Sequence, residues 1–372
     1  MKKVLGFILS VVKGVLASGI LLLALATFFG GSYGQTICLV LAATFLLYWP
    51  TKVRDKLGNN ISAVVRTLTI LSLLAIKQWV FVSEPKTSIY KTESYKKELM
   101  AEYRKCMQAW PSSTTERYLT TQYGKVHVLE VGKKENPPLV MLHAASMGAH
   151  SWAENLPSVL EEYHIYAIDN IGEGNKSELD NALVFPDSPK EIADFYLEIF
   201  DKLEIDSAIV FGASNGGYIA QTLAYNYPEK VEKMVLFGPM GLTQLTNTSI
   251  AMMSLATMYP LQFLRDAVAD WAIGTAAVCH EKYGAWFNVI MKGTIPSVSA
   301  PVPMTIEQKQ VMDLPILLFL GTNDRIVGDA QIAKEKAGYY PNIQIEILNS
   351  GHLMAVEKSE IINQKTAQFL KN

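Results

Sequence analysis

The sequence predicts an α/β fold with a mostly parallel, doubly wound sheet and a helical cap, preceded by N-terminal transmembrane helices. Three observations lead to this expectation. Apolar residues are concentrated before Val82, short apolar runs separated by helical patterns recur after Leu139, and four of these runs end in clusters of glycine and small polar residues. Buried parallel strands covered by helices give such a pattern.

The composition limits the classes of function that this chain can have. With 372 residues, of which 49% are hydrophobic and 18% charged, it is a folded chain rather than a disordered one. Its net charge is −2, and lysine and arginine are spread along its whole length, so no basic face for nucleic acid is expected. Three cysteines, Cys38, Cys106 and Cys279, lie far apart without a metal-binding spacing.

Residues 1–82 are expected to form a membrane region that contacts the lipid bilayer through two or three transmembrane helices. Apolar runs at 4–29 and 33–49 approach the ~20 helical residues that cross a bilayer. A third run, at 61–82, either spans the bilayer or lies in its interface. A cleaved signal peptide fits less well, because the first run is long and a second follows at once.

The charges beside these runs bear on their orientation. Lys2 and Lys3 precede the first run, and Lys52, Arg54 and Lys56 follow the second, so both of these ends are expected in the cytoplasm. With two spans the rest of the chain is cytoplasmic, and with three it faces outward.

Residues 83–113 are rich in lysine and glutamate and carry apolar residues at helical spacing, which predicts an amphipathic helical connector. A globular domain is expected at 114–372. It begins with a hairpin whose two strands flank Tyr123 and Gly124. The strands expected in this domain are 117–121, 126–131, 139–142, 165–168, 208–211, 234–237, 316–320 and 343–347.

Ser214 is the expected nucleophile. It is the centre of a Gly-x-Ser-x-Gly pattern that follows an apolar strand and opens a helix, the context in which such a serine is held proud of a sheet. Gly212 and Gly216 suit a turn too tight for a β-carbon. The alternative role, a serine that only caps the following helix, does not require this strand-turn-helix setting.

A serine hydroxyl needs a histidine to accept its proton and a carboxylate to orient that histidine. His352 follows the expected strand at 343–347 and a glycine, which no other histidine of the chain does. Asp324 follows the expected strand at 316–320, whereas no carboxylate follows the strand at 234–237. We therefore expect Ser214, Asp324 and His352 to form a catalytic triad.

An acyl-transfer intermediate also needs N–H groups that stabilise its oxyanion. The backbone N–H of Asn215, at the start of the helix after Ser214, is expected to supply one. The second is expected from Ala145, in the loop after the strand at 139–142, with Ala144 as the alternative. His143 is interpreted as a histidine that braces this loop.

These motifs resemble those of the α/β-hydrolase superfamily, and among its members the bacterial carboxylesterases. The segments that carry the resemblance are His143 to Trp152, Asp169 to Ser177, Gly212 to Tyr218, Gly321 to Val327 and Gly351 to Glu357. The resemblance implies an α/β-hydrolase fold and hydrolysis of a small-molecule ester through an acyl-serine intermediate, without metal or organic cofactor. Together with the apolar runs of residues 1–82, it makes a bacterial cell membrane the expected location. This chain departs from the family pattern at Ala144, where a glycine is usual.

The stretch at about 240–314 leaves the strand pattern and resembles the helical cap of many relatives. It is rich in methionine and aromatic residues: Met252, Met253, Met258, Tyr259, Trp271, Trp286, Phe287 and Met291. Such a cap, together with the membrane region, favours an ester with an apolar acyl group. Alternatives on the same scaffold are hydrolysis of carbon–carbon, thioester or amide bonds, lipase-like activity, and a catalytically silent ligand-binding receptor. The sequence makes no prediction of the oligomeric state.

Overall fold

The computed structural model describes residues 88–243, 249, 268, 270–272, 274 and 276–372. The chain divides into two compact units, Met1–Glu84 and Pro85–Asn372. The expected membrane runs at 4–29, 33–49 and 61–82 lie outside the described residues. Within the described part of the chain, no helix combines the length and the apolar character needed to cross a membrane.

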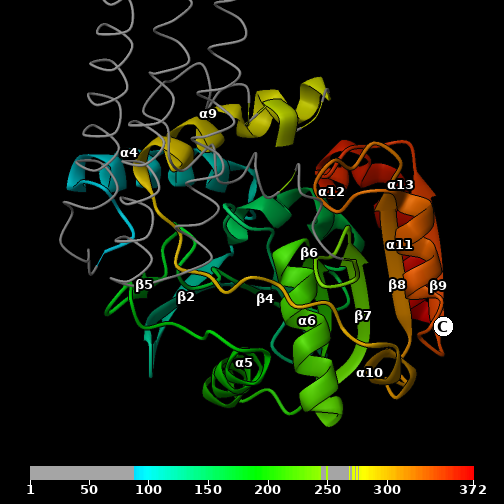
Figure 1. The fold of residues 1–372 in the computed structure, drawn as a ribbon. Coiled ribbons are helices and arrows are strands. Elements are labelled where there is room, and N and C mark those ends of the chain that lie inside the picture. Colours follow the sequence, from blue (N-terminus) through cyan, green and yellow to red (C-terminus); the bar gives the residue numbers. More distant parts are fainter. Residues whose placement is uncertain (1–87, 244–248, 250–267, 269, 273, 275) are drawn as a thin grey trace, which may run out of the picture. The chain divides into compact units, whose positions relative to one another are not determined.

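One sheet forms the centre of the described unit (Figure 1). Its strands are β1 (Thr115–Thr121), β2 (Gly124–Val131), β3 (Pro138–Leu142), β4 (His164–Ile168), β5 (Glu178–Leu179), β6 (Ala208–Ala213), β7 (Val231–Phe237), β8 (Ile316–Gly321) and β9 (Ile343–Leu348). They lie in the order β1-β2-β4-β3-β6-β7-β8-β9, with β5 paired to β2. From β4 to β9 all neighbours are parallel, whereas β1, β2 and β5 pair antiparallel.

The expected strands are confirmed, because each of the eight ranges expected at 117–347 coincides with a strand of this sheet. The hairpin is confirmed as well: Thr121 pairs with Gly124, whose φ of 142° suits glycine. The two-residue β5 was not expected, since a strand of two residues has no periodicity that could reveal it.

Alternate residues of the central strands face opposite sides of the sheet, and each side is covered by helices. Val140 and Leu142 pack in the cluster that contains the side chains of α5 (Pro189–Leu203) and α6 (Asn215–Asn226). Leu139 and Met141 pack in the cluster on the other face, against the 3₁₀ segment Ala149–Ser158 and α13 (Ser359–Lys371). Burial of apolar side chains on both faces explains why these strands appear in the sequence as continuous apolar runs.

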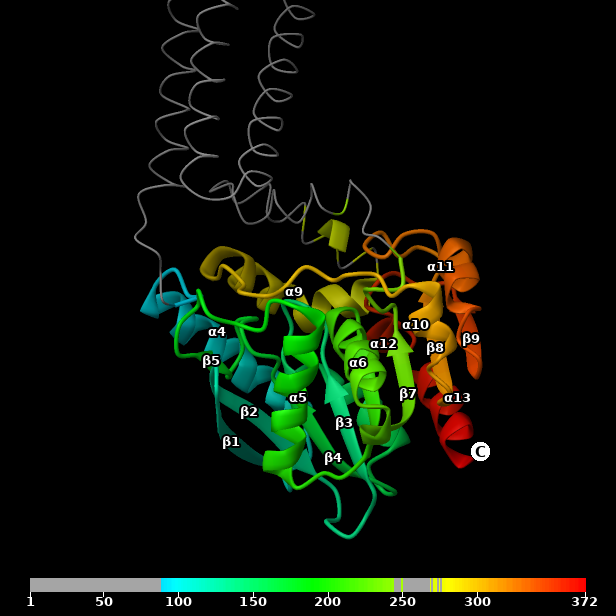
Figure 2. The same ribbon diagram turned by 60° about the horizontal axis from the view of Figure 1, so that its bottom comes forward.

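The remaining helices are α4 (Glu93–Cys106), α9 (Ala277–Gly293), α10 (Ile306–Gln310), α11 (Ala330–Ala337) and α12 (Met354–Glu357). Of these, α9 and α10 lie in the stretch expected to form the cap. Figure 2 shows α9 over the carboxyl ends of the parallel strands, where sheets of this kind expose their sites. Four residues on which the cap was expected to rest, Met252, Met253, Met258 and Tyr259, lie outside the described residues.

The helix α4 packs directly onto α9. The side chain of Thr92 caps its first turn by accepting a hydrogen bond from the Tyr95 N–H. Leu99 and Tyr103 are buried in a third cluster, together with Trp286 of α9. The segment expected to be an amphipathic connector is thus an amphipathic helix that shares a hydrophobic cluster with the cap helix.

Candidate active site

Ser214 lies at a sharp turn between β6 and α6. Its backbone has φ 49° and ψ −112°, a conformation that costs a non-glycine residue on the order of 1–3 kcal/mol. The turn is held because the Ser214 N–H donates to the Phe237 carbonyl at 3.0 Å, and the Ser214 carbonyl accepts from Met240 at 2.9 Å. The strand-turn-helix arrangement expected around this serine is therefore present.

The two glycines of this turn are required by close contacts. A β-carbon at Gly216 would lie 2.0 Å from the carbonyl oxygen of Leu142, and one at Gly212 would lie 2.6 Å from the carbonyl oxygen of Gly216. Neither contact can be relieved by rotating a side chain, since both involve backbone atoms. The glycines thus bring the serine turn against the end of β3.

The structure brings His352 and Asp324 together from two different loops. The His352 Nδ1 and the Asp324 Oδ2 are 2.8 Å apart, and both side chains are almost completely buried. The second oxygen of Asp324 accepts from the N–H groups of Ile326 at 2.9 Å and Val327 at 3.0 Å. With both oxygens engaged, the carboxylate is fixed in position and in turn fixes the imidazole.

Gly238, at the end of β7, makes room for this pair. Its φ is 47°, and a β-carbon there would lie 3.0 Å from the Asp324 Oδ2 and 3.6 Å from the His352 Nδ1. No carboxylate follows this strand, and the glycine there leaves space for Asp324, from the loop after β8.

Ser214 and His352 line the same cavity. The Ser214 side chain is nearly buried, with 2% of the residue exposed. No hydrogen bond joins its hydroxyl to the His352 imidazole in this structure. In enzymes without bound substrate such contacts are often loose and shorten when substrate binds.

The loop after β3 carries Ala145 and meets the start of α6. The N–H of Ala145 makes no hydrogen bond to any described residue, whereas the next N–H, that of Ser146, donates to the Glu173 carboxyl at 2.9 Å. Ala144, Ala145 and Ser214 all line the cavity. Asn215 is the first residue of α6, so its N–H has no partner within the helix and lies at the positive end of the helix dipole.

His143 braces this loop from within the core. Its Nε2 accepts from the Asn170 N–H at 2.8 Å, so its Nδ1 carries the proton and donates to the Ala144 carbonyl at 2.8 Å. Burial lowers the pKa of His143 below its usual value, which keeps the ring neutral. The side chain therefore fixes the loop and does not reach the cavity.

A cavity of about 130 Å³ extends from Ser214 toward the cap. Its wall is mainly apolar, and its cap-side lining comes from Val268, Trp271, Ala272, Phe287, Ile290, Met291, Thr294 and Pro296. Three of the residues singled out in the expected cap, Trp271, Phe287 and Met291, thus face the same space as the serine. Within the described ranges, His, Cys, Asp and Glu side chains nowhere gather in groups of three that could hold a metal ion.

Two residues have roles in the site that were not expected from the sequence. Glu173 contacts both the loop after β3 and the start of α6, and the Trp286 indole N–H donates to the Ser146 carbonyl at 2.8 Å. The signal for Glu173 was an acid between two glycines directly after a buried strand. Trp286 was expected only as an aromatic residue of the cap, and nothing in its place in the sequence indicated its hydrogen bond to Ser146.

Comparisons with known proteins bear on the fold and on the class of reaction. The model of the family described as alpha/beta hydrolase fold matches residues 137–270. Carboxylesterase YbfK of Bacillus subtilis is 26% identical over 281 residues, which covers 72% of this chain and 92% of that protein. An uncharacterized carboxylesterase, nap, of the same organism is 25% identical over 279 residues, which covers 72% of this chain and 90% of that protein.

Solved structures give the same picture of the fold. The crystal structure of carboxylesterase CesB (YbfK) from Bacillus subtilis has a TM-score of 0.69 at 24% identity, covering 74% of this chain and 98% of that one. That of naproxen esterase (carboxylesterase NP) from the same organism also has a TM-score of 0.69 at 24% identity, covering 75% and 99%.

Proposed function

We infer that this chain, which has the α/β-hydrolase fold, is a carboxylesterase-like serine hydrolase that acts on ester bonds through Ser214, His352 and Asp324. The observation that carries this conclusion is the arrangement at the carboxyl ends of β6, β8 and β9. A serine on a strained turn lines the same cavity as a histidine that is hydrogen-bonded to an aspartate. The relatives named carboxylesterase support the class of reaction.

In the proposed mechanism, the Ser214 Oγ attacks the ester carbonyl while the His352 Nε2 takes its proton. Asp324, hydrogen-bonded to Nδ1, stabilises the imidazolium that forms. The N–H groups of Ala145 and Asn215 donate to the oxyanion of the tetrahedral intermediate. His352 then protonates the departing alcohol, and a water molecule activated by the same histidine releases the acid and restores the serine hydroxyl.

We further propose that the acyl group or alcohol held beneath the cap is apolar. The cavity wall that faces Ser214 contains Phe287, Ile290 and Met291 from α9, and methionine adapts to ligands of different shape. Transfer of a methylene group from water to such a wall is worth about 0.8 kcal/mol. Chain length should therefore change the specificity constant.

The apolar runs at 4–29, 33–49 and 61–82 support a proposal on location: the enzyme is an integral protein of a bacterial cell membrane, anchored by its N-terminal region. The sequence allows two spans with a cytoplasmic catalytic unit or three with an outward one. Protease protection in sealed vesicles distinguishes these two arrangements.

A test of the function uses the full chain, purified in a mild detergent, with a fluorophosphonate probe and a series of p-nitrophenyl esters. Wild-type protein is expected to be labelled and to turn over esters, and Ser214→Ala to do neither. If folded wild-type protein is not labelled and does not hydrolyse the esters, the chain is a ligand-binding receptor and not an enzyme. If the enzyme cleaves only short polar esters, the proposal of an apolar acyl group is wrong, whereas the serine mechanism stands.

A further inference from the structure

Glu173 is a buried carboxyl group without a cationic partner. It lies in the loop after β4 and is only 1% exposed. Among the residues that the structure describes, no lysine, arginine or histidine forms an ion pair with it. Such an acid costs free energy to bury, so its retention next to the cavity calls for a function.

The loop that holds Glu173 is shaped by glycines and covered by the cap. Gly172 and Gly174, on either side, have φ values of 80° and 74°. The Ser297 N–H donates to the Gly172 carbonyl at 2.9 Å, and a β-carbon at Gly172 would lie 2.2 Å from the Ser297 carbonyl oxygen. The segment after α9 thus closes over this loop, and the carboxyl group is directed inward.

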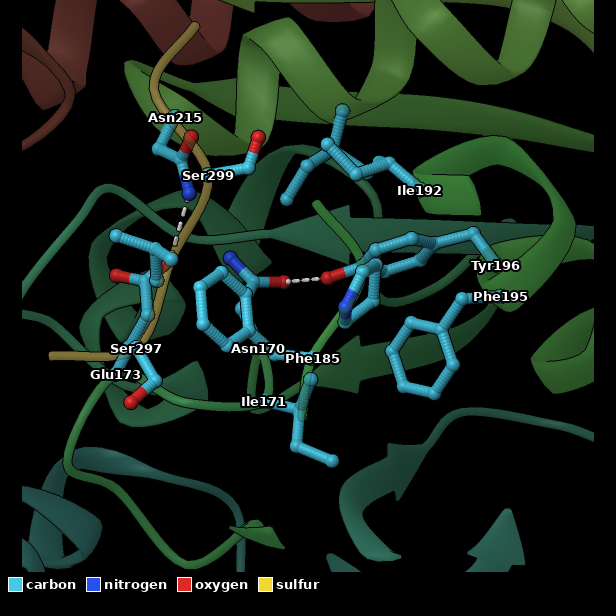
Figure 3. Close-up of a pocket in the computed structure, with 13 residues that line it drawn as sticks. Asn170, Ile171, Glu173, Phe185, Ile192, Phe195, Tyr196, Asn215, Ser297 and Ser299 are labelled. Atoms are coloured by element: carbon cyan, nitrogen blue, oxygen red, sulfur yellow. Dashed lines mark hydrogen bonds between the residues drawn. The ribbon is translucent and has the colours of Figure 1, made fainter. Parts of the chain in front are cut away.

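Both oxygens of the carboxyl group are used. One accepts from the Asn215 side-chain amide at 2.7 Å and the other from the Ser146 backbone N–H at 2.9 Å. Figure 3 shows the first of these contacts, with Glu173 and Asn215 joined by a dashed line. Asn215 and Ala145, the neighbour of Ser146, are the two residues whose N–H groups are proposed to hold the oxyanion. One carboxyl group therefore connects the loop after β3 with the start of α6.

Ser146 needs such support because its backbone is in the left-handed region, with φ 60°. Its N–H is held by Glu173, and its carbonyl accepts from the Trp286 indole at 2.8 Å. With the first of these contacts removed, the peptide between Ala145 and Ser146 is free to rotate toward a more favourable conformation. The preceding peptide, which carries the Ala145 N–H, is joined to this one at the Ala145 Cα, so it would lose its fixed direction as well.

We propose that Glu173 is a positioning residue for acylation: its carboxyl group sets the separation and direction of the two oxyanion donors on Ala145 and Asn215. This inference rests on the proposed function. It adds to that function a residue that does not touch the substrate and acts through the backbone on either side of the nucleophile.

The protonation state of Glu173 suits this role. Burial, with a smaller contribution from the Asp169 charge, raises the pKa of Glu173 to about 8. A neutral carboxyl group places no negative charge beside a developing oxyanion. It can accept from Ser146 and donate to Asn215, whose amide oxygen and nitrogen exchange places by a half-turn of the side chain. The other titratable group facing it is Tyr196, which donates to Asn170 at 2.8 Å (Figure 3).

The test compares Glu173→Ala, Glu173→Asp and Glu173→Gln in the full chain. We expect kcat of Glu173→Ala for a p-nitrophenyl ester to fall about tenfold to a hundredfold, since removal of a whole oxyanion donor costs more than displacement of one. KM should change by less than about threefold, because ground-state binding does not use these donors. The inhibition constant of a trifluoromethyl ketone, which forms a tetrahedral adduct with the serine, should weaken by the same factor as kcat/KM.

The two conservative variants, Glu173→Gln and Glu173→Asp, test whether the reach and hydrogen bonds of the side chain matter. Glu173→Gln keeps one acceptor and one donor at the same reach, and we expect it to retain kcat within about threefold. Glu173→Asp keeps the carboxyl group but is too short to reach both amides, and its kcat should fall about tenfold. If Glu173→Ala does not fold, Glu173→Asp decides in its place.

Glu130→Ala is the matched control, because Glu130 is also a buried carboxylate but lies on β2, bound to His164 at 2.9 Å and to Arg117 at 3.3 Å. It should lower the unfolding temperature while leaving kcat within about twofold of wild type. Equal kcat in wild type and the Ala or Asp variant of Glu173 would overturn the inference, as would a loss matched by Glu130→Ala. In either case labelling of wild type, and its absence in Ser214→Ala, would leave the proposed function standing.

Discussion

At the scale of single residues, the site depends on positions that are strained by themselves and held by their neighbours. Ser214 and Ser146 are two of three non-glycine residues with positive φ among those described, and they lie on the two loops that face the cavity. Each has its backbone N–H and carbonyl hydrogen-bonded to another element. Strain of this kind persists where surrounding contacts fix it, and it places reactive groups where relaxed backbone would not.

The Asp324–His352 contact leads to the first expected outcome. In Asp324→Asn the side chain keeps its size, but its amide can present an N–H to His352 Nδ1 and so favours the wrong tautomer. We expect kcat to fall by on the order of 10³–10⁴, with the unfolding temperature nearly unchanged. The exposed Asp313→Asn, whose partner is Asn342, serves as control and should keep its kcat. If kcat of Asp324→Asn falls by less than about tenfold, another residue is the acid that orients His352.

Glu173 gives an expected dependence of stability on pH. Its pKa is about 8 in the folded state and 4.5 in the unfolded chain. Between these values the folded state binds a proton that the unfolded state does not, so the wild-type protein loses stability as the pH rises from about 4.5 to about 8. Glu173→Gln lacks this titration, since its side chain is never charged.

The measurement is thermal unfolding of wild type and Glu173→Gln over this pH range. The difference in stability in favour of the variant should widen by on the order of 1 kcal/mol per pH unit and level off above about pH 8. Asp169 and Tyr196, the titratable groups that act on Glu173, are present in both proteins, so their contributions cancel. A constant difference would mean that Glu173 is ionised throughout.

The residues of the site differ in how well the sequence predicts them. Ser214 and His352 are set by local patterns, a strand followed by glycine-flanked polar residues, and such patterns are visible in one chain. Glu173 and Trp286 act through partners 42 and 140 residues away in sequence. Their role depends on how loops from different strands come together, which no local pattern contains.

At the scale of elements, the serine turn depends on the fit between α6 and β3. Gly216→Ala places a β-carbon 2.0 Å from the Leu142 carbonyl oxygen, so the start of α6 must move away from the strand. We expect a loss of roughly 2–4 kcal/mol in the free energy of unfolding and loss of turnover.

Gly284→Ala in α9 is the control for this substitution. A β-carbon at Gly284, inside α9, meets no atom of the described residues within 4 Å beyond the backbone of its own helix. We expect it to stabilise the protein by about 0.5–1 kcal/mol, because alanine loses less conformational freedom than glycine on forming a helix. Denaturant unfolding measures both variants, and similar destabilisation in the two would show that close approach at the serine turn is not the cause.

The strands were predictable because burial on both faces of a parallel sheet leaves a strong apolar signal. The sequence did not reveal β5, which is two residues long, nor the way in which residues 293–297 lie over the loops of the site. The contact of Ser297 with Gly172 joins the end of the cap helix to the loop after β4. It is made by backbone atoms, so side-chain types carry no record of it.

At the scale of the whole described unit, the segment that precedes the β1–β2 hairpin packs against elements that surround the cavity. Ile89 and Lys91 pair by backbone hydrogen bonds of 2.8 Å with Ile295 and Gly293, at the end of the cap helix. The Tyr90 hydroxyl donates to the Asn175 carbonyl at 2.7 Å, two residues from Glu173. A chain segment that follows the expected membrane region therefore contacts both the cap and the loop that positions the oxyanion donors.

Two truncated chains test this dependence. A chain of residues 85–372 retains α4, whereas one of residues 114–372 starts at the hairpin and loses Leu99 and Tyr103 from the cluster around Trp286. Loss of one buried leucine alone costs about 2–5 kcal/mol, a large part of the 5–15 kcal/mol by which domains are stable. We expect the shorter chain to aggregate or unfold at a much lower temperature and to have little esterase activity, with the longer chain active.

Leu99→Ala in the longer chain should have an intermediate unfolding temperature. Equal unfolding temperatures and equal kcat for the two truncations would show that α4 and the segment before it are dispensable, and that the cap helix is held by the sheet alone.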